Sequence, residues 1–179
     1  GSLVDETAPL TPTTERGKRR VVAENIWLKH NAHIFRLPGI YGHGRSSLDR
    51  VRDGLTRRVH RPNHLFSRIH VDDISQCVIA SMNKPNPGTV YNVCDDEAAE
   101  QQLVDAYASK LLGTKPPPLV RFKDAAKEMT PMALSFWQDN RRVNNTKIKS
   151  ELGVKLFYPT FREGLKSLHE NVEGINKTL

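Results

Sequence analysis

Thr89–Cys94, with the sequence TVYNVC, is the segment that decides the fold class. It is rich in β-branched and aromatic residues, which is typical of a buried β-strand. Before it, apolar side chains recur at helical spacing from Ile74 to Met82, and a loop with two prolines separates the two segments. After it, Glu100–Leu112 carries one apolar face and is followed by Gly113, a residue type that commonly closes helices. The predicted strand therefore lies between two predicted helices.

The same alternation continues outward to both ends of the chain. Further strands are predicted at Ala32–Leu37, Phe66–Val71 and Leu119–Phe122. Two further helices are predicted at Glu15–His30 and Pro131–Trp137. Others are predicted to begin after a capping residue, which is Ser46 or Ser47, Asp72, Asn144 or Asn145, or Thr160. The apolar face consists of Leu48, Val51 and Leu55 in the helix after Ser46 and Ser47, and of Phe161, Leu165, Leu168 and Val172 in the helix after Thr160. Residues 3–14, the glycine-containing run 38–44 and the basic run 57–64 are expected to be loops. This order predicts an α/β fold with some parallel sheet.

Composition narrows the class of protein. At 179 residues, of which 37% are hydrophobic and 26% charged, the chain is long enough to bury a core. Its net charge of +7 favours anionic partners such as phosphorylated small molecules, nucleic acid or acidic protein surfaces. No apolar run approaches the roughly 18 residues of a spanning helix, so no membrane span is predicted. Cys77 and Cys94 lack metal or redox spacing, which predicts buried free thiols and an intracellular, reducing compartment, the cytoplasm or an organelle matrix.

Several signatures of binding and catalytic sites are absent from the sequence. It contains no G-x-G-x-x-G run, no Walker-type loop and no G-x-S-x-G elbow. Gly39, Gly42 and Gly44 lack the spacing of a phosphate-binding loop, and they follow Pro38 instead of leading into a helix. The histidines do not cluster at metal-ligand spacing. The residues alone therefore predict no metal site and no dinucleotide cradle in this chain.

The basic stretch Pro12–Glu24, PTTERGKRRVVAE, opens the first predicted helix. Arg16 and Arg20 are four residues apart, so they are neighbours on one helix surface. Such a cluster is most often a solvated helix face, and the alternative is an anion-binding surface. Trp27 lies on the apolar face of the same helix and, with Tyr107 and Trp137, is expected in the core.

Four segments, in order, resemble one protein family. They are RLPGIYG (Arg36–Gly42), RIHVDDI (Arg68–Ile74), TVYNVCDD (Thr89–Asp96) and ELGVKLFYPTFREGL (Glu151–Leu165). Together they resemble the C-terminal half of extended short-chain dehydrogenases, the NAD-dependent epimerase/dehydratase-like proteins, and most closely their atypical bacterial-type oxidoreductase members. The resemblance implies the C-terminal portion of a Rossmann-like NAD(P)-binding domain at 1–95, elements of a small α/β substrate domain at 96–172, and a tail at 173–179. The glycine-rich half would then lie N-terminal to Gly1, or on a partner chain.

The resemblance also implies an altered catalytic pair. Aligning Pro12, Gly17 and Glu24 with the family motif places Arg16 at the position of the acid/base Tyr and Arg20 at the position of the Lys. The other register, with Thr14 and Lys18, breaks the match at Gly17 and Glu24. A guanidinium stays protonated near pH 7 and accepts no proton, so Arg16 is unable to act as the Tyr does. Two facing cations instead suit a phosphate or carboxylate.

Other site residues follow from the resemblance. Pro38, Gly39 and Tyr41 correspond to the loop that passes along the nicotinamide, so NAD or NADP is expected, but only together with the glycine-rich half. An anionic substrate would be contacted by Arg45, Arg68 and Arg142 in addition to Arg16 and Arg20, although a solvated surface is the alternative for each. His70, Asp72 and Asp73 are expected to be structural, at a strand end and a helix start.

Three functions remain open at this point. The first is part of an NAD(P)-binding extended short-chain dehydrogenase or epimerase-like protein, acting on a sugar-nucleotide-like or other anionic substrate without the usual Tyr and Lys chemistry. The second is a catalytically silent family member, or pseudoenzyme, that serves as an accessory subunit of a larger assembly. The third is nucleic-acid binding through the basic runs, which no recognised motif supports.

Overall fold

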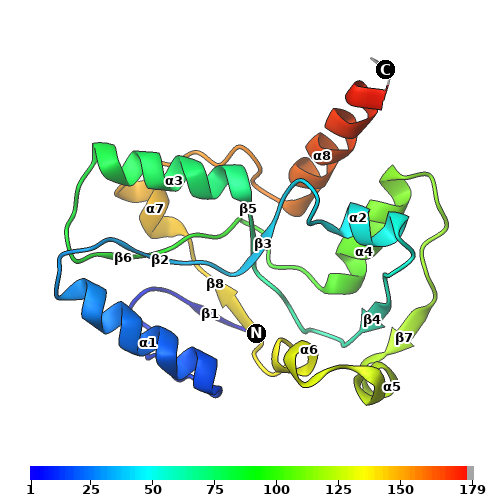
Figure 1. Ribbon diagram of the computed structural model, residues 1–179, viewed down its shortest axis with the longest axis horizontal. Coiled ribbons are helices and arrows are strands. Elements are labelled where there is room, and N and C mark those ends of the chain that lie inside the picture. The colour runs from blue at the N-terminus through cyan, green and yellow to red at the C-terminus, as the bar shows by residue number, and fades with distance from the viewer. Residues whose placement is uncertain (177–179) are drawn as a thin grey trace.

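The computed structural model describes the backbone of residues 1–176 and the side chains of residues 1–171. Figure 1 shows a mixed α/β arrangement, with a strand-rich part that holds α1 and α3 and a helical part that holds α2, α4 and α8. Every strand pair in the described residues is parallel, which confirms the predicted fold class. The pairs are β1 (Ser2–Val4) with β8 (Arg141–Val143), β2 (Ile34–Arg36) with β6 (Val90–Asn92), β3 (Gly39–Tyr41) with β5 (Arg68–His70), and β4 (Arg58–His60) with β7 (Leu119–Arg121).

Three of these strands lie where the sequence predicted loops, and a fourth lies where it predicted no element. β1 falls partly within the predicted lead-in, β3 in the glycine-containing run, β4 in the basic run, and β8 in a segment with no predicted element. Each is three residues long and pairs with a strand distant in sequence. Tertiary pairing has therefore overridden local turn chemistry, which a pattern of neighbouring residues does not report.

Most of the helices begin and end close to their predicted limits, except that the two short helical segments within 122–128 were not predicted and the first of them begins at the last residue of a predicted strand. They are α1 (Glu15–Leu28), α2 (Ser47–Arg52), α3 (Val71–Asn83), α4 (Gln101–Leu111), α5 (Phe122–Ala125), the 3₁₀ turn η1 (Ala126–Glu128), α6 (Pro131–Ser135), α7 (Thr146–Ser150) and α8 (Phe161–Asn176). Helix α8 thus enters the predicted tail 173–179, of which 177–179 lie outside the described residues, as does the side chain of Val172. Two details were wrong: α2 ends before Leu55, which is exposed, and the cap of α3 is not Asp72. The ring of His70 caps α3 by accepting from the Asp72 N–H at 3.2 Å.

Two buried clusters hold the fold together. The strand-rich part buries Ile69, Cys77, Tyr91, Val93, Ile148, Leu152 and Val154. The helical part buries Tyr41, Leu48, Ala99, Val104, Ala108, Phe161, Leu165 and Leu168. Cys77 and Cys94 are buried free thiols, as predicted. Because Tyr41 and Leu48 join a cluster otherwise built from 99–168, the chain on both sides of residue 95 builds the helical core.

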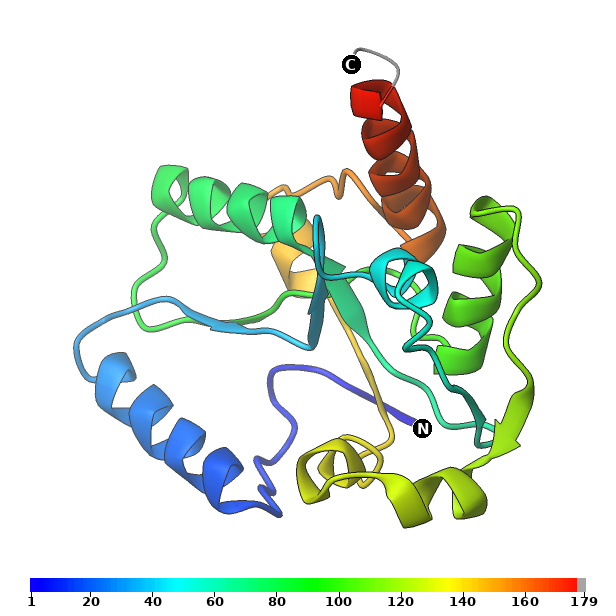
Figure 2. The same cartoon turned by 45° about the vertical axis from the view of Figure 1, so that its right-hand side comes forward.

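Helix α1 has no buried residue, contrary to the prediction that Trp27 belongs to the core. Trp27 is 60% exposed and Val22 58% exposed. Figures 1 and 2 show α1 and α3 on opposite sides of the β2–β6 pair. Strand β2 pairs only with β6 among the described residues, so its other edge has no neighbouring strand there. The apolar stripe of α1 is real, but the described chain provides nothing that covers it.

Candidate functional site

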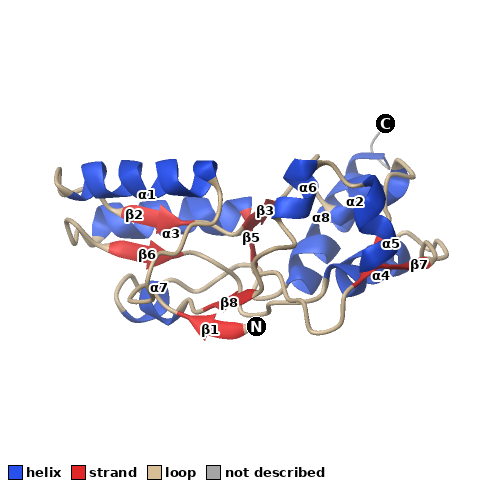
Figure 3. Ribbon diagram, turned by 90° about the horizontal axis from the view of Figure 1, so that it is seen from below, coloured by secondary structure: helices blue, strands red, loops and turns tan. Residues whose placement is uncertain are grey.

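A broad cleft of about 1750 Å³ lies between α1, the β2–β3 segment and α6. In Figure 2 α1 lies at the lower left, α6 at the bottom, and the β2–β3 segment above them. In Figure 3 β2 and β6 lie next to α1 and α3 at one end of the molecule, β3 and β5 lie near its centre, and β7 lies with α4 and α5 at the other end. The parallel pairing of β3 with β5 brings the loop before β3 and the residues of β5 to one side of the cleft. The cleft is therefore built from segments that are distant in sequence.

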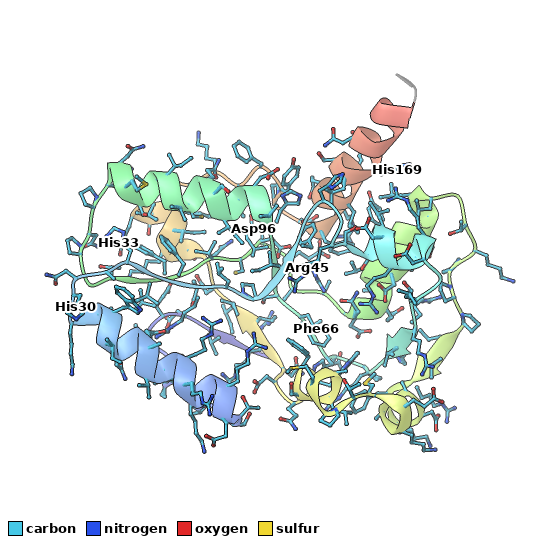
Figure 4. The ribbon with its side chains drawn as sticks, in the orientation of Figure 1. His30, His33, Arg45, Phe66, Asp96 and His169 are labelled. Atoms are coloured by element: carbon cyan, nitrogen blue, oxygen red, sulfur yellow. The ribbon has the colours of Figure 1, made fainter. Side chains whose placement is uncertain are left out.

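Most of the arginines and loop residues predicted for the site line this cleft. They are Arg16, Arg20, Pro38, Gly39, Tyr41, Arg45 and Arg68. Figure 4 labels Arg45 in the loop between β3 and α2, near the centre of the molecule. Arg142 is not part of the lining: it is exposed, and its Nε donates to the Gly1 carbonyl oxygen at 3.1 Å. The structure thus brings four of the five predicted arginines together.

The described lining is electropositive. Seven arginines face four carboxylates: Arg16, Arg20, Arg36, Arg45, Arg50, Arg68 and Arg141 against Glu24, Asp49, Asp53 and Asp139. Glu24 is already engaged, because it binds Arg36 at 2.5 and 3.1 Å and so ties α1 to β2. No described side chain pairs with Arg16, Arg20 or Arg45. These three cations are exposed and free to meet an anion that enters the cleft.

Tyr41 lies at the floor of the cleft, where β3 ends. Its side chain is buried between His70, whose ring centroid is 5.1 Å away, and α8. The approach to α8 is close because position 164 is a glycine: a Cβ there would lie 2.8 Å from two carbons of the Tyr41 ring. Burial raises the pKa of the Tyr41 hydroxyl, with the Asp95 carboxyl adding to the effect. The hydroxyl is therefore a poor proton donor, and it has no hydrogen-bond partner in the structure.

Arg68 is the buried cation of the site. It is 7% exposed, and its Nη2 donates to the Ala99 carbonyl at 3.4 Å and to Gln101 Oε1 at 3.5 Å. Its Nη1 has no partner. Burial lowers the pKa of the guanidinium, although nearby Asp95 opposes the shift. A buried guanidinium nitrogen without an acceptor is costly, so this atom marks where a ligand acceptor would bind.

Two buried carboxyl groups beside Arg68 were not predicted from the sequence. Asp95 follows the β6 segment, and burial raises its pKa to about 8. Asp105, in α4, is fully buried, and it accepts from Ser47 Oγ and Gln101 Nε2, both at 2.9 Å. Burial also raises the pKa of Asp105. A carboxylate directly after a buried strand is the only sequence signal for Asp95, and the burial of either group depends on the tertiary fold.

The neighbouring acidic pair has a structural use. Asp73 is fully buried and accepts from the Phe157 N–H at 2.6 Å and from the Tyr158 N–H at 3.2 Å, which anchors the segment before α8. Asp72 is exposed in the first turn of α3.

Among the described residues no group of three or more His, Cys, Asp or Glu side chains is arranged to hold a metal ion. In that part of the chain, no helix combines the length and apolarity needed to cross a membrane.

The chain is similar to several known proteins in sequence and in structure. Protein YeeZ of Escherichia coli K12 is 28% identical over 162 residues, which cover 87% of this chain and 53% of that protein. A structure described as a functionally unknown conserved protein from Silicibacter pomeroyi matches with a TM-score of 0.90 and 51% identity over 97% of this chain and 61% of that one. The NAD complex of dTDP-glucose 4,6-dehydratase from Bacillus anthracis matches with a TM-score of 0.73 and 19% identity over 99% and 57%. The fold is Rossmann-like.

The matches cover only part of the related proteins, and most of the matching structures have low sequence identity to this chain. The chain spans little more than half the length of the E. coli relative and about three fifths of the S. pomeroyi protein. Solved neighbours are epimerase/dehydratase-type proteins, several of them complexed with NAD or NADPH. At 15–22% identity these neighbours establish the fold alone. No protein-family model matches the sequence.

Proposed function

We propose that this chain is the substrate-side half of an NAD(P)-binding protein of the extended short-chain dehydrogenase type, which binds an anionic, sugar-nucleotide-like substrate without the usual Tyr and Lys chemistry. The observation that carries the proposal is the cleft, where the loop at Pro38 and Gly39 faces free arginines and the buried Arg68. A guanidinium presents donors in a planar fork that matches phosphate and carboxylate oxygens.

The residues present fit one part of a nicotinamide cofactor. Leu37, Gly39 and Ile40 expose a small apolar surface on the cleft wall, and no atom fills the space beyond Gly39 closer than ordinary contact distance. Such a surface suits a flat, weakly polar ring. The chain has no glycine-rich loop for the pyrophosphate, so that grip must come from elsewhere. When bound, the nicotinamide would supply hydride transfer, and this chain would orient the substrate.

A Rossmann half fits the uncovered surfaces of the strand-rich part. The open edge of β2 offers unpaired backbone groups to a further parallel strand. Helices α1 and α3 flank that edge and expose Val22, Ile26, Ile79 and Met82. A sheet that continues past β2 would cover these side chains, as α/β folds require of both faces of a parallel sheet. The same polypeptide or a partner chain could supply this half.

Cofactor binding is the direct test. We expect the protein, together with its glycine-rich half, to change NADH or NADPH fluorescence at micromolar cofactor concentration. The measurement is a fluorescence titration with each cofactor, with the reduced nicotinamide mononucleotide as a control that lacks the adenosine end. Absence of binding at millimolar concentration would overturn the cofactor part of the proposal.

A second candidate, a catalytically silent subunit, is favoured by Arg16 and Arg20. Because neither guanidinium accepts a proton, we expect the unaltered protein to turn over no nucleotide sugar of a panel supplied with NAD or NADP. Only the double variant Arg16→Tyr and Arg20→Lys should restore Tyr-dependent hydride transfer, measured by absorbance of the reduced cofactor. Robust turnover by the unaltered protein that is lost in Arg16→Ala would contradict the silent role and would assign Arg16 to a different mechanism.

A further inference from the structure

A buried polar cluster lies under the floor of the cleft. It consists of Tyr41, Arg68, Asp95 and Asp105, whose exposed fractions are 9%, 7%, 3% and 0%. They come from four segments: the end of β3, the start of β5, the chain after β6, and α4. Tyr41 and Arg68 also line the cleft, so the cluster reaches the space where a ligand would enter.

Each member of this cluster has one polar atom with no hydrogen-bond partner. These atoms are Tyr41 Oη, Arg68 Nη1, Asp95 Oδ2 and Asp105 Oδ2. Buried polar atoms are almost always paired, so four unpaired atoms in one cluster point to something that binds there. A buried guanidinium next to buried carboxyl groups would be expected to form ion pairs, yet Arg68 forms none with Asp95.

Asp95 is nonetheless held close to Arg68. The Asp95 N–H donates to the Arg68 carbonyl oxygen at 2.7 Å, which fixes the two residues side by side on adjacent segments. The Asp95 side chain accepts only from the Glu97 N–H, at 3.3 Å. The groups that face it are Arg68 and Tyr41 from the strands, and Asp96 and Glu97 from its own segment. Among the described residues, Arg68 is the cation that would stabilise an ionised Asp95.

Burial outweighs Arg68 in setting the charge of this carboxyl. Burial raises the pKa of Asp95 to about 8, whereas Arg68 and the Glu97 N–H lower it. Near pH 7 Asp95 is therefore mostly protonated and gives Arg68 no counter-charge, while the carboxyl groups of Asp105 and Glu97 also act on the guanidinium. As the pH rises through the pKa, the carboxylate forms and becomes available to Arg68.

We propose that Asp95 regulates the anion site: its protonated carboxyl leaves Arg68 free to bind an anion in the cleft, and its ionised carboxylate competes with that anion. The inference rests on the proposed function, because it assumes that the cleft takes an anionic ligand at Arg68. It assigns to Asp95 a role in controlling when the site is open.

The sign and size of the effect follow from linkage. If the anion binds only the form with protonated Asp95, its affinity falls as the pH rises. With the pKa of Asp95 at about 8, the protonated fraction falls about tenfold between pH 7 and pH 9, and the affinity falls with it. Linkage is reciprocal, so a bound anion must in turn raise the pKa of Asp95.

Sulfate is a suitable probe because its charge does not change over this range of pH. We expect calorimetric titration with sulfate, at constant ionic strength, to give an affinity about tenfold lower at pH 9 than at pH 7. In Asp95→Asn, which keeps the shape and removes the ionisation, the affinity should stay high and lose this dependence on pH. A second measurement uses the unaltered protein: the carbon-13 shift of the Asp95 carboxyl, followed against pH, should show a higher pKa with sulfate than without.

The outcomes separate the two proposals. Sulfate binding that is equal at pH 7 and pH 9, or an Asp95 pKa that sulfate does not move, overturns the role of Asp95 while the anion site stands. No sulfate binding at either pH removes the anion site itself, and with it both proposals. Should Asp95→Asn fold poorly, the carboxyl titration of the unaltered protein decides the question alone.

Discussion

Replacing Gly164 with alanine is expected to lower the free energy of unfolding by about 3 kcal/mol. A Cβ at this position would lie 2.8 Å from the Cε2 and Cζ atoms of Tyr41, and closer still to its hydroxyl. Tyr41 has little room to retreat, because it is packed in the same cluster as Leu48 and Phe161. Alanine in a helix interior ordinarily adds about 1 kcal/mol of stability relative to glycine, so a loss would show that the clash prevails.

Urea unfolding of three variants tests this packing. Gly164→Ala combined with Tyr41→Phe should recover part of the loss, since the hydroxyl is removed while the ring carbons remain. Lys166→Ala, at an exposed position of the same helix, should change the free energy of unfolding by no more than about 0.5 kcal/mol. A Gly164→Ala protein as stable as the unaltered one would mean that Tyr41 does not hold β3 against α8.

Strands and helices were predictable where one segment carries its own signal. TVYNVC forms β6 because its residues favour a pleated, buried surface, and Ser46 caps α2 through a local capping box with Asp49. Strands β1, β4 and β8 carry no such signal, because their sequences SLV, RVH and RRV each hold one β-branched residue and no Phe, Tyr or Trp. The apolar stripe of α1 was recognised correctly, but a stripe does not say what covers it, and Trp27 is exposed.

The candidate site was also predictable only in part. Arg16, Arg20, Arg45 and Arg68 were predicted as anion ligands, and the fold brings them into one cleft. Arg142 carries the same charge but lies on β8, outside that cleft. The difference between Arg68 and the exposed arginines is its burial, which comes from the packing of β5 against β3 and α8. The charge of a side chain is known from the sequence. Its burial depends on tertiary contacts, and burial strengthens the interaction of that charge with other charges.

Replacing Arg68 with glutamine is expected to weaken sulfate binding about thirtyfold at pH 7. A charge-assisted hydrogen bond contributes about 2 kcal/mol, and each 1.4 kcal/mol changes an affinity tenfold. Glutamine keeps a polar group near the Ala99 carbonyl and Gln101, so the buried site retains some of its hydrogen bonding. Calorimetric titration at constant ionic strength measures the loss directly.

Arg142→Gln is the matched control, because it removes the same charge from an exposed position whose contact is the Gly1 carbonyl oxygen. Sulfate affinity should be unchanged within about twofold, because the charge of an exposed side chain is screened by solvent and salt far more than that of a buried one. Equal losses in Arg68→Gln and Arg142→Gln would mean that sulfate responds to net charge and not to a site.

Arg16, Arg20 and Arg45 are exposed and should each contribute less than Arg68, with a contribution that declines as salt is added. A loss at Arg68 that persists in high salt would therefore place the anion at the buried floor of the cleft and not at its mouth.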